Sequence, residues 1–539
     1  MIMKMFFFLS LLCVSSFAFI VKSSSSSLLV SSSLSKQTLV ITDKNNKNRN
    51  LNHNHIDTEK SRLVVVNKNT NNNNDVDIVA ADLSDDDEKK KNLPQSYIIL
   101  GIMLLTFIAN QWSRQALYYL CNFTENGDAL RHINVALNFD KEQYATLASL
   151  GFTVVFSIVS LFAGSVSDNN NRNVILALSC TVWSICTSLQ GLASSYTDLV
   201  PLRALIGASQ SFFNPAAYTL IADIFPKSMV GSVNGIFSSG IYLGGGLASL
   251  SILLDNILGW RKTVLIIGVF GIVAALLCTL IVPEPRLLKI ENNKNVIDVT
   301  PIETKNVNLN DLFNDAVVAL KEILKSDEAK LLYSATVLRF CAGFTIGIWK
   351  APFVFAKFPG SESIFAGSNA LVVSMGGLLS TIIGGYISDS LANPKDPSKR
   401  RIARAWVPAI GSLLAAPLWA AFVLIDDPTY AAVCLFFEYI VAECWFGPTL
   451  AVLFNVVPKA RRGAAQGLFS MLSAVGNIAP ILVGTLAGGA YGNFPLGTVL
   501  IYFISGSYVL SGLLFGFAAL LDEKKISLEY NEKKETSSL

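Results

Sequence analysis

The sequence predicts an all-α integral membrane protein with twelve transmembrane helices arranged as two six-helix bundles. Hydrophobic residues make up 52% of the 539 residues and charged residues only 15%, and the mean hydropathy is +0.47. Twelve segments have about 20 largely apolar residues, the length a helix needs to cross a hydrocarbon core of roughly 30 Å. Similar polar turns, GSVSDNNNRN at 164–173 and GGYISDSLANPKDPSKRR at 384–401, occupy corresponding places in the two halves. This recurrence indicates an internal duplication.

The chain before the first span has the features of a targeting region. Residues 1–42 are predicted to be a signal-like or transit-like segment, because Lys4 precedes an apolar stretch that ends in small residues. The motif VSSFAF at 14–19 resembles the cleavage site of plastid proteins in diatom-type algae. It favours the plastid envelope, with the plasma membrane or an endomembrane as the alternatives. Residues 43–93, rich in Asn, Asp and Lys, are predicted to be disordered.

The N-terminal bundle is predicted over residues 94–283 and the C-terminal bundle over 331–521, followed by a tail at 522–539. Each span must be helical, because lipid offers its backbone no hydrogen-bonding partner. The spans of the first bundle are expected at 97–120, 144–166, 174–194, 199–225, 233–258 and 263–282. Those of the second are expected at 331–356, 364–387, 405–424, 430–456, 464–491 and 499–521.

A polar linker at 284–330 joins the two bundles. Its later part, LNDLFNDAVVALKEIL, places apolar residues on one helical face. This predicts an amphipathic helix at the membrane surface or a small soluble helix that packs on the linker. Loops after even-numbered spans carry about 17 Lys and Arg residues and loops after odd-numbered spans about 5, so the even loops and both termini are expected on the cytosolic side.

The clearest internal repeat follows spans four and ten. FPKSMVGSVNGIF at 225–237 and VPKARRGAAQGLF at 457–469 share two Gly, one Pro, one Lys and one Phe at matching positions. Slightly upstream, Asn214-Pro215 corresponds to Gly447-Pro448. A proline at this place breaks or kinks the span and frees backbone carbonyls.

Over residues 97–521 the chain resembles the major facilitator superfamily. The family pattern G-x-x-x-D-[RK]-x-G-[RK]-[RK] after span two is met at Gly164, Asp168 and Arg172, and it is broken at three asparagines. Arg203 with Gly207 resembles the R-x-x-x-G pattern of span four. The resemblance implies charge contacts between the bundles that hold the cytosolic side closed. The expected conformational gate comprises Gly164, Asp168, Arg172, Arg203 and Asp389.

Within this family, RALIGASQSFFNPAAYTLIADIFPK at 203–227 is most similar to the Spinster-type branch. Members of that branch typically have an Asp before the span-one Arg and a Glu in the G-E-A-S motif of span four. This chain has Ser113 and Gln210 there instead. Proton coupling through those two carboxylates is therefore not implied.

Two arginines inside spans are candidate substrate ligands. A charge within a span costs several kcal/mol and therefore suggests a function. Arg114 lies in span one and Arg339 in span seven. Facing one cavity, two guanidiniums would bind phosphate or carboxylate, which resembles the organic-phosphate antiporters. Their positions along the helices differ by about 13 Å, so the two arginines could have separate partners. Arg114 could instead reach the outer interface and bind Glu125 or a carbonyl, and Arg339 could pair with Glu438 or Glu443.

Other polar residues within the spans complete the candidate site. Tyr118 and Asn214 are further candidates for contact with substrate. Glu438 and Glu443 point in directions about 140° apart on span ten, so only one can face a cavity squarely. Such a carboxylate could take up a proton and couple transport to a pH gradient, or serve as a charge partner for Arg339.

Taken together, these residues predict a secondary active transporter of a small organic solute, preferably an organic anion. The alternatives are a Spinster-like carrier of a lipid or a sugar-type metabolite, and a non-transporting membrane sensor on the same scaffold. We find no nucleophile–base set, metal cluster or phosphate loop, so neither an enzyme nor a cofactor is predicted. The net charge of +3 is too small to suggest nucleic acid. The expected partners are the substrate, a co- or counter-transported ion and the lipid bilayer, and the chain is expected to be a monomer.

Overall fold

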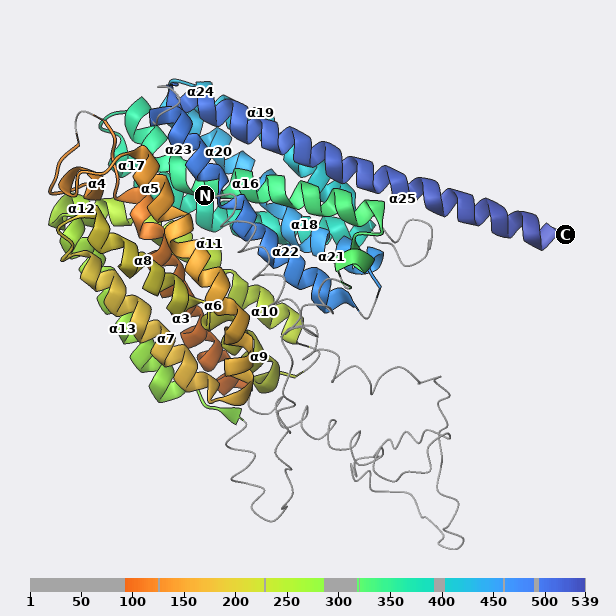
Figure 1. Cartoon of the computed structure of the whole chain (residues 1–539), viewed down its shortest axis with the longest axis horizontal. Coiled ribbons are helices and arrows are strands. Elements are labelled where there is room, and N and C mark those ends of the chain that lie inside the picture. The colour runs from red at the N-terminus through yellow and green to blue at the C-terminus, as the bar shows by residue number, and fades with distance from the viewer. Residues whose placement is uncertain are drawn as a thin grey trace, which may run out of the picture.

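The computed structural model describes residues 93–124, 127–226, 229–285, 318, 320–391, 403–458, 461–488 and 494–538. The predicted targeting segment at 1–42, almost all of the tail at 43–93 and most of the linker lie outside these ranges. Every regular element in the described ranges is helical (Figure 1). Eleven described helices are long and apolar enough to cross a membrane.

The N-terminal half contains the helices of the first six predicted spans. They are α3 (Leu93–Tyr119), α4 (Ile133–Ala136), α5 (Lys141–Ala148), α6 (Leu150–Asn169), α7 (Arg172–Gln190), α8 (Tyr196–Gln210), α9 (Phe213–Ile224), α10 (Val230–Ser238), α11 (Gly240–Ser249), α12 (Ser251–Leu258) and α13 (Trp260–Ile281). Span four is broken into α8 and α9, and neither part alone has the length of a span. The break lies four residues before Pro215, whose ring would clash with the carbonyl of Ser211 in a continuous helix.

The C-terminal half repeats this arrangement. Its helices are α16 (Asp327–Lys357), α17 (Glu362–Leu371), η1 (Val372–Gly376), α18 (Gly377–Leu391), η3 (Ala403–Ala405), α19 (Trp406–Leu424), α20 (Pro428–Ala442), η4 (Glu443–Trp445), α21 (Phe446–Val456), α22 (Arg462–Gly476), α23 (Ala479–Gly488), α24 (Leu496–Leu500), η6 (Ile501–Ser505) and α25 (Gly506–Ser538). Helix α25 continues to Ser538 and so includes most of the predicted tail at 522–539. It extends away from the bundle (Figure 1).

The end of the linker packs against the C-terminal half. Ile323 is buried there, among residues that include Trp445 and Phe469. Glu322 accepts a 2.6 Å hydrogen bond from Nε of Arg461. This bond to a guanidinium lowers the pKa of Glu322. The end of the linker, just before span seven, is therefore packed against the C-terminal half.

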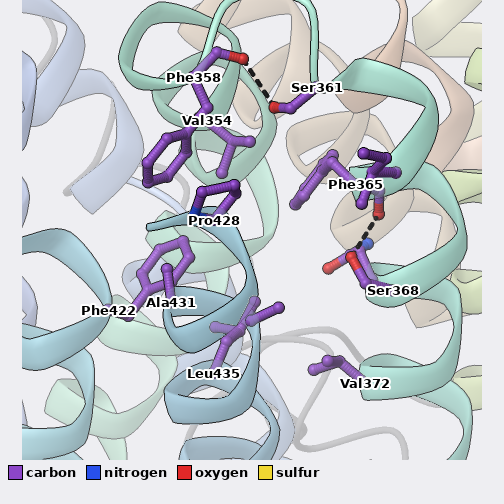
Figure 2. Close-up of a pocket in the computed structure, with 13 residues that line it drawn as sticks. Val354, Phe358, Ser361, Phe365, Ser368, Val372, Phe422, Pro428, Ala431 and Leu435 are labelled. Carbon is purple, nitrogen blue, oxygen red and sulfur yellow. Dashed lines mark hydrogen bonds between the residues drawn. The ribbon is translucent and has the colours of Figure 1, made fainter. Parts of the chain in front are cut away.

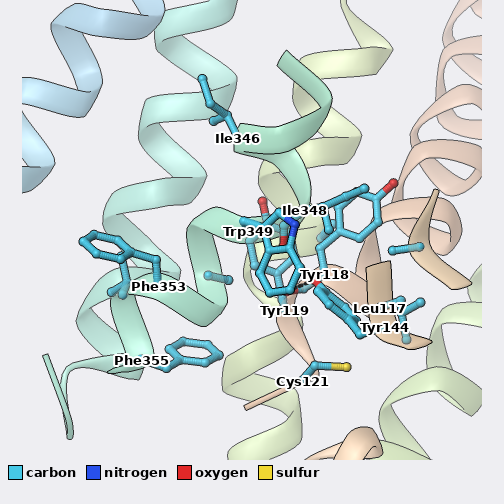
Figure 3. Packing of buried hydrophobic residues seen from close by; sticks show 14 of the residues in the cluster. Leu117, Tyr118, Tyr119, Cys121, Tyr144, Ile346, Ile348, Trp349, Phe353 and Phe355 are labelled. Carbon is cyan, nitrogen blue, oxygen red and sulfur yellow. Dashed lines mark hydrogen bonds between the residues drawn. The ribbon is translucent and has the colours of Figure 1, made fainter. Parts of the chain in front are cut away.

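The two halves meet at the end of the molecule where odd-numbered loops join the spans, which we call the odd-loop end. Tyr118 and Tyr119 of α3 lie beside Tyr144 of α5 and Trp349 of α16 (Figure 3). Tyr144 Oη donates a 2.6 Å hydrogen bond to the carbonyl of Ile348, and its ring meets Trp349 edge-on. The described conformation is therefore sealed at the odd-loop end.

Further neutral hydrogen bonds strengthen this seal. Asn369 of α17 donates to the hydroxyls of Tyr119 and Ser249, at 3.1 and 2.9 Å. Ser249 in turn donates to the carbonyl of Ala366. These bonds join residues of opposite halves and therefore hold the two halves together at the odd-loop end.

Substituting Gly484 tests the seal. A Cβ at Gly484 would lie 3.0 Å from the carbonyl of Lys141 and 3.1 Å from Cζ2 of Trp349, so the larger side chain of Gly484→Leu should force α5 and α23 apart. We expect a cysteine placed at the buried Ser249 to react with a maleimide at least about fivefold faster in this variant. Gly235→Leu is the matched control, because a Cβ there has no atom within 4 Å. Equal labelling in the two variants would contradict a seal at this position.

Candidate functional site

Arg172, at the start of α7, holds together the even-loop end of the N-terminal half. Its side chain is fully buried, and Nη1 lies 2.7 Å from Oδ2 of Asp223 on α9. It also forms an ion pair with Glu284, which follows α13, and its backbone N–H donates to the same carboxylate at 2.8 Å. These described ion pairs lie within one half, whereas the sequence resemblance implied contacts between halves. The reason is proximity, because α7 packs along α13 and this places Glu284 directly beside Arg172.

The other predicted gate residues are placed as follows. Gly164 and Asp168 lie in α6, and their side chains are outside the described part of the structure. Asp389, at the end of α18, pairs with Arg404 of the same half at 3.0 Å, and its side chain is 78% exposed. A gate formed by these residues stays a prediction.

Arg203, the fifth predicted gate residue, lies elsewhere, beside Arg114. Nη1 of Arg203 donates a 3.1 Å hydrogen bond to the backbone carbonyl of Arg114. Both guanidiniums lie over the ring of Phe152, at 4.4 Å for Arg114 and 5.8 Å for Arg203. Gly207 allows this approach, because a Cβ there would lie 2.4 Å from the carbonyl of Phe152. Arg203 and Gly207 of span four therefore place a second guanidinium beside Arg114 of span one.

Among the residues that the structure describes, the surroundings of this arginine pair are neutral. Arg203 is fully buried, and its Nε and Nη2 make no hydrogen bond with the described residues. Gln210 donates to Ser113 Oγ and to the carbonyl of Asn110, both at 3.1 Å, at the positions where Spinster-type proteins carry acids. Within the described ranges, no carboxylate lies within 4 Å of either guanidinium. The pair is therefore not neutralised by an acid of the described chain.

Arg339 is placed differently, inside the C-terminal half. It is 1% exposed, and Nη2 donates to the carbonyl of Ala442 at 2.8 Å. The same atom lies 3.6 Å from Oε1 of Glu443, and the guanidinium stacks over Trp445 and Tyr508. Of the two pairings that the sequence left open, the described structure has the one with Glu443. The structure shows no contact between Arg114 and Arg339.

Glu438 and Lys350 complete a buried polar network around Arg339. Glu438 accepts a hydrogen bond from Tyr508 Oη, and its Oε2 has no hydrogen-bond partner among the described residues. The sequence reasoning missed Lys350. Nζ of this buried lysine of α16 donates to Tyr439 Oη at 3.1 Å and lies 4.8 Å from the ring centroid. Its position within span seven was a sufficient signal, since a charge inside a span is costly.

The two remaining predicted substrate ligands lie apart from each other. Tyr118 is 7% exposed and lies in the seal at the odd-loop end. Asn214 is half-buried at the start of α9, and its Oδ1 has no described hydrogen-bond partner. Tyr118 is thus near Arg203 and the seal, while Asn214 belongs to the broken span four.

A small apolar pocket lies away from all of these residues. It is formed between α16, α17, α19 and α20 at the odd-loop end, where Phe358, Phe365 and Leu435 face inward (Figure 2). None of its lining residues carries a charge. The pocket therefore does not form part of the arginine sites.

The sequence matches the family described as Major Facilitator Superfamily over residues 96–480. The chain belongs to the major facilitator superfamily. It is a membrane transporter rather than an enzyme, and the predicted twelve-helix fold in two bundles is confirmed.

Curated relatives in this superfamily have diverse names. An MFS-type efflux pump of Mycolicibacterium smegmatis is 22% identical and covers 68% of this chain and 82% of its own. Protein spinster of Drosophila melanogaster is 24% identical over 64% of this chain and 55% of its own. A probable galactarate/D-glucarate transporter of Bacillus subtilis is 24% identical and covers 84% of this chain and 97% of its own.

Solved structures support the same fold. A bacterial homologue of the human lysosomal transporter Spinster has a TM-score of 0.60 and 20% identity, and the match covers 80% of this chain and 97% of that chain. The nucleoside transporter NupG has a TM-score of 0.54 and 17% identity over 78% of this chain and 98% of its own. These structures confirm the predicted fold, and the family match together with the Drosophila relative confirms the predicted resemblance to the superfamily and to Spinster homologues.

The buried cluster around Arg172 makes a stability prediction. Arg172→Ala removes charge-assisted bonds from Glu284, whose side chain is only 4% exposed, so we expect a loss of about 3 kcal/mol in the free energy of unfolding. SDS titration of the purified protein would measure this loss. Arg404→Ala is the control, because its partner Asp389 is exposed and such pairs contribute little. Losses of similar size in both variants would be inconsistent with a special role for the buried pair.

Proposed function

We propose that this protein is a secondary active transporter that moves a small organic anion by alternating access of its two halves. The observation that carries the proposal is the Arg114–Arg203 pair over Phe152, which the described residues do not neutralise. A buried guanidinium with unused N–H groups is costly unless a ligand supplies acceptors. A carboxylate or phosphate offers the oxygen pair that these planar groups bind well.

The names of several relatives support an organic anion. Besides the galactarate/D-glucarate transporter, a D-galactonate transporter of Escherichia coli and a hexuronate transporter of Bacillus subtilis match this chain at 23% and 21% identity. All three names describe sugar acids, so we propose a hydroxylated carboxylate as the substrate class. A Spinster-like lipid or sugar-type carrier is the alternative, supported by the Drosophila relative. We further propose the plastid envelope as the membrane, on the VSSFAF motif alone.

Counterflow in proteoliposomes tests the anion site. Liposomes loaded with D-glucarate, D-galactonate or phosphate should accumulate the corresponding radiolabelled anion. Arg114→Ala or Arg203→Ala should lower the rate at least about 30-fold, since each removes a charge-assisted bond to the anion. Arg114→Lys keeps the charge without the planar fork and should retain part of the activity. Lys262→Ala, which removes an exposed cation at the odd-loop end, is the control.

Three results would count against this assignment. Wild-type rates in Arg203→Ala would show that the pair does not bind the transported anion. Failure of all anions together with counterflow of a neutral sugar or a lipid would favour the Spinster-like alternative. A purified, folded protein with no counterflow of any tested solute would favour a sensor on the same scaffold.

Glu438 is the residue that we propose to take up a coupling proton. It is 1% exposed, one of its oxygens has no described hydrogen-bond partner, and its other oxygen is held by Tyr508. Glu438→Gln should abolish the stimulation of uptake by an imposed acidic gradient while leaving anion counterflow, which needs no net proton movement, within about twofold. Asp426→Asn, at a 96% exposed acid, is the control. Retained stimulation in Glu438→Gln would exclude Glu438 as the coupling site.

A further inference from the structure

Glu443 is the one carboxylate in the described spans that contacts both an intramembrane arginine and the opposite half. Its Oε1 lies 3.6 Å from Nη2 of Arg339, and its Oε2 lies 3.5 Å from Oη of Tyr242. Arg339 belongs to the C-terminal half, whereas Tyr242 belongs to α11 of the N-terminal half. The three side chains therefore form a chain across the interface between the halves.

Both contacts of Glu443 are at the long end of their ranges. A charge-assisted N–H···O bond is normally 2.7–2.9 Å, so the pair with Arg339 is an electrostatic contact rather than a well-formed hydrogen bond. The Glu443 side chain remains 27% exposed, while Arg339 is 1% exposed. Glu443 therefore has a path toward solvent, whereas Arg339 is enclosed by Glu443, Trp445 and Tyr508.

Arg339 retains unused capacity for a carboxylate. Its Nε and Nη1 are buried and make no hydrogen bond with the described residues. Nη2 donates to the carbonyl of Ala442 and lies near Glu443, and the guanidinium stacks over Trp445 and Tyr508. A free carboxylate could approach two N–H groups side by side, which Glu443 does not do in this arrangement.

Tyr242 is held firmly enough to sense the position of Glu443. Its ring lies directly against Gly377 of α18, where an added Cβ would come within 2.1 Å of Tyr242 Cδ1. Any residue larger than Gly would displace the ring. The hydroxyl is thereby fixed close to Glu443 while the halves are in this conformation.

We propose that Glu443 is a built-in carboxylate that occupies Arg339 between transport events, held there by Tyr242 from the opposite half. An arriving organic anion replaces Glu443 on Arg339, and the released Glu443 breaks the contact with Tyr242. Arg339 is then a second anion-binding point that becomes available only through this exchange. The exchange links substrate binding to separation of the halves, and it rests on the anion transport proposed above.

Modification of Arg339 by phenylglyoxal, followed by mass spectrometry, tests the occupancy of this arginine without any substrate. Glu443→Gln removes the competing charge at nearly constant shape, so Arg339 should react at least about fivefold faster than in the wild type. Tyr242→Phe keeps the ring on Gly377 but removes the hydroxyl, and it should give a smaller increase. Asp426→Asn, which removes a 96% exposed carboxylate, is the control and should leave the reaction of Arg339 within about twofold. Arg203 in the same protein is the internal reference.

An unchanged rate for Arg339 in Glu443→Gln would overturn the proposal. An equal increase at Arg203 would also overturn it, because the variant would then have loosened the whole protein. Protection by D-glucarate separates this idea from the proposed function. Protection of Arg339 at lower D-glucarate concentration in Glu443→Gln supports the exchange. Protection of Arg203 but never of Arg339 overturns the exchange and leaves the N-terminal anion site standing, whereas protection of neither arginine argues against the anion substrate itself.

Discussion

The high cost of a charge in the hydrocarbon region determines how every ionisable group in these bundles is arranged. Arg172 meets this cost with two carboxylates, and Arg339 with a carbonyl, Glu443 and two aromatic rings. Arg203 meets it only in part, with one carbonyl and the ring of Phe152. Because isolated intramembrane charges are selected against unless they serve a purpose, the incomplete satisfaction of Arg203 is the feature that most directly indicates a ligand.

The two halves are duplicated in topology but not in electrostatics. The N-terminal half presents two guanidiniums among neutral amides and hydroxyls, because Ser113 and Gln210 stand where related proteins carry acids. The C-terminal half balances two cations, Arg339 and Lys350, with two carboxylates. On the proposed function, anion binding falls to the first half, while the second contains the groups proposed to exchange a proton or an internal carboxylate. This division follows from a handful of side chains and leaves the helix arrangement unchanged.

The sequence was sufficient for the fold and insufficient for the site. The length of each apolar segment and the Pro215 break depend only on local chemistry, so both could be predicted. The pairing of Arg114 with Arg203 could not, because it depends on how closely α8 approaches α6, and Gly207 reveals that distance only once the helices are packed. The symmetry of the two halves suggested that Arg114 and Arg339 face one cavity, whereas the difference of about 13 Å in their positions along the helices already argued against a shared ligand. Lys350 could have been predicted as a site residue from the sequence, because it is a charged residue within span seven.

The distribution of bonds explains how the halves can separate at modest cost. The ion pairs described above join residues of one half, or join Glu322 of the linker to the half on which it packs. A rocking motion of the halves therefore leaves them intact. The odd-loop seal consists instead of neutral hydrogen bonds such as those of Tyr144 and Asn369, each worth about 1 kcal/mol net. Breaking several of them is within reach of the free energy of binding a small ligand. Glu443 differs from the other acids in these pairs because its second oxygen contacts Tyr242 of the opposite half. If Glu443 leaves Arg339, its contact across the interface changes as well.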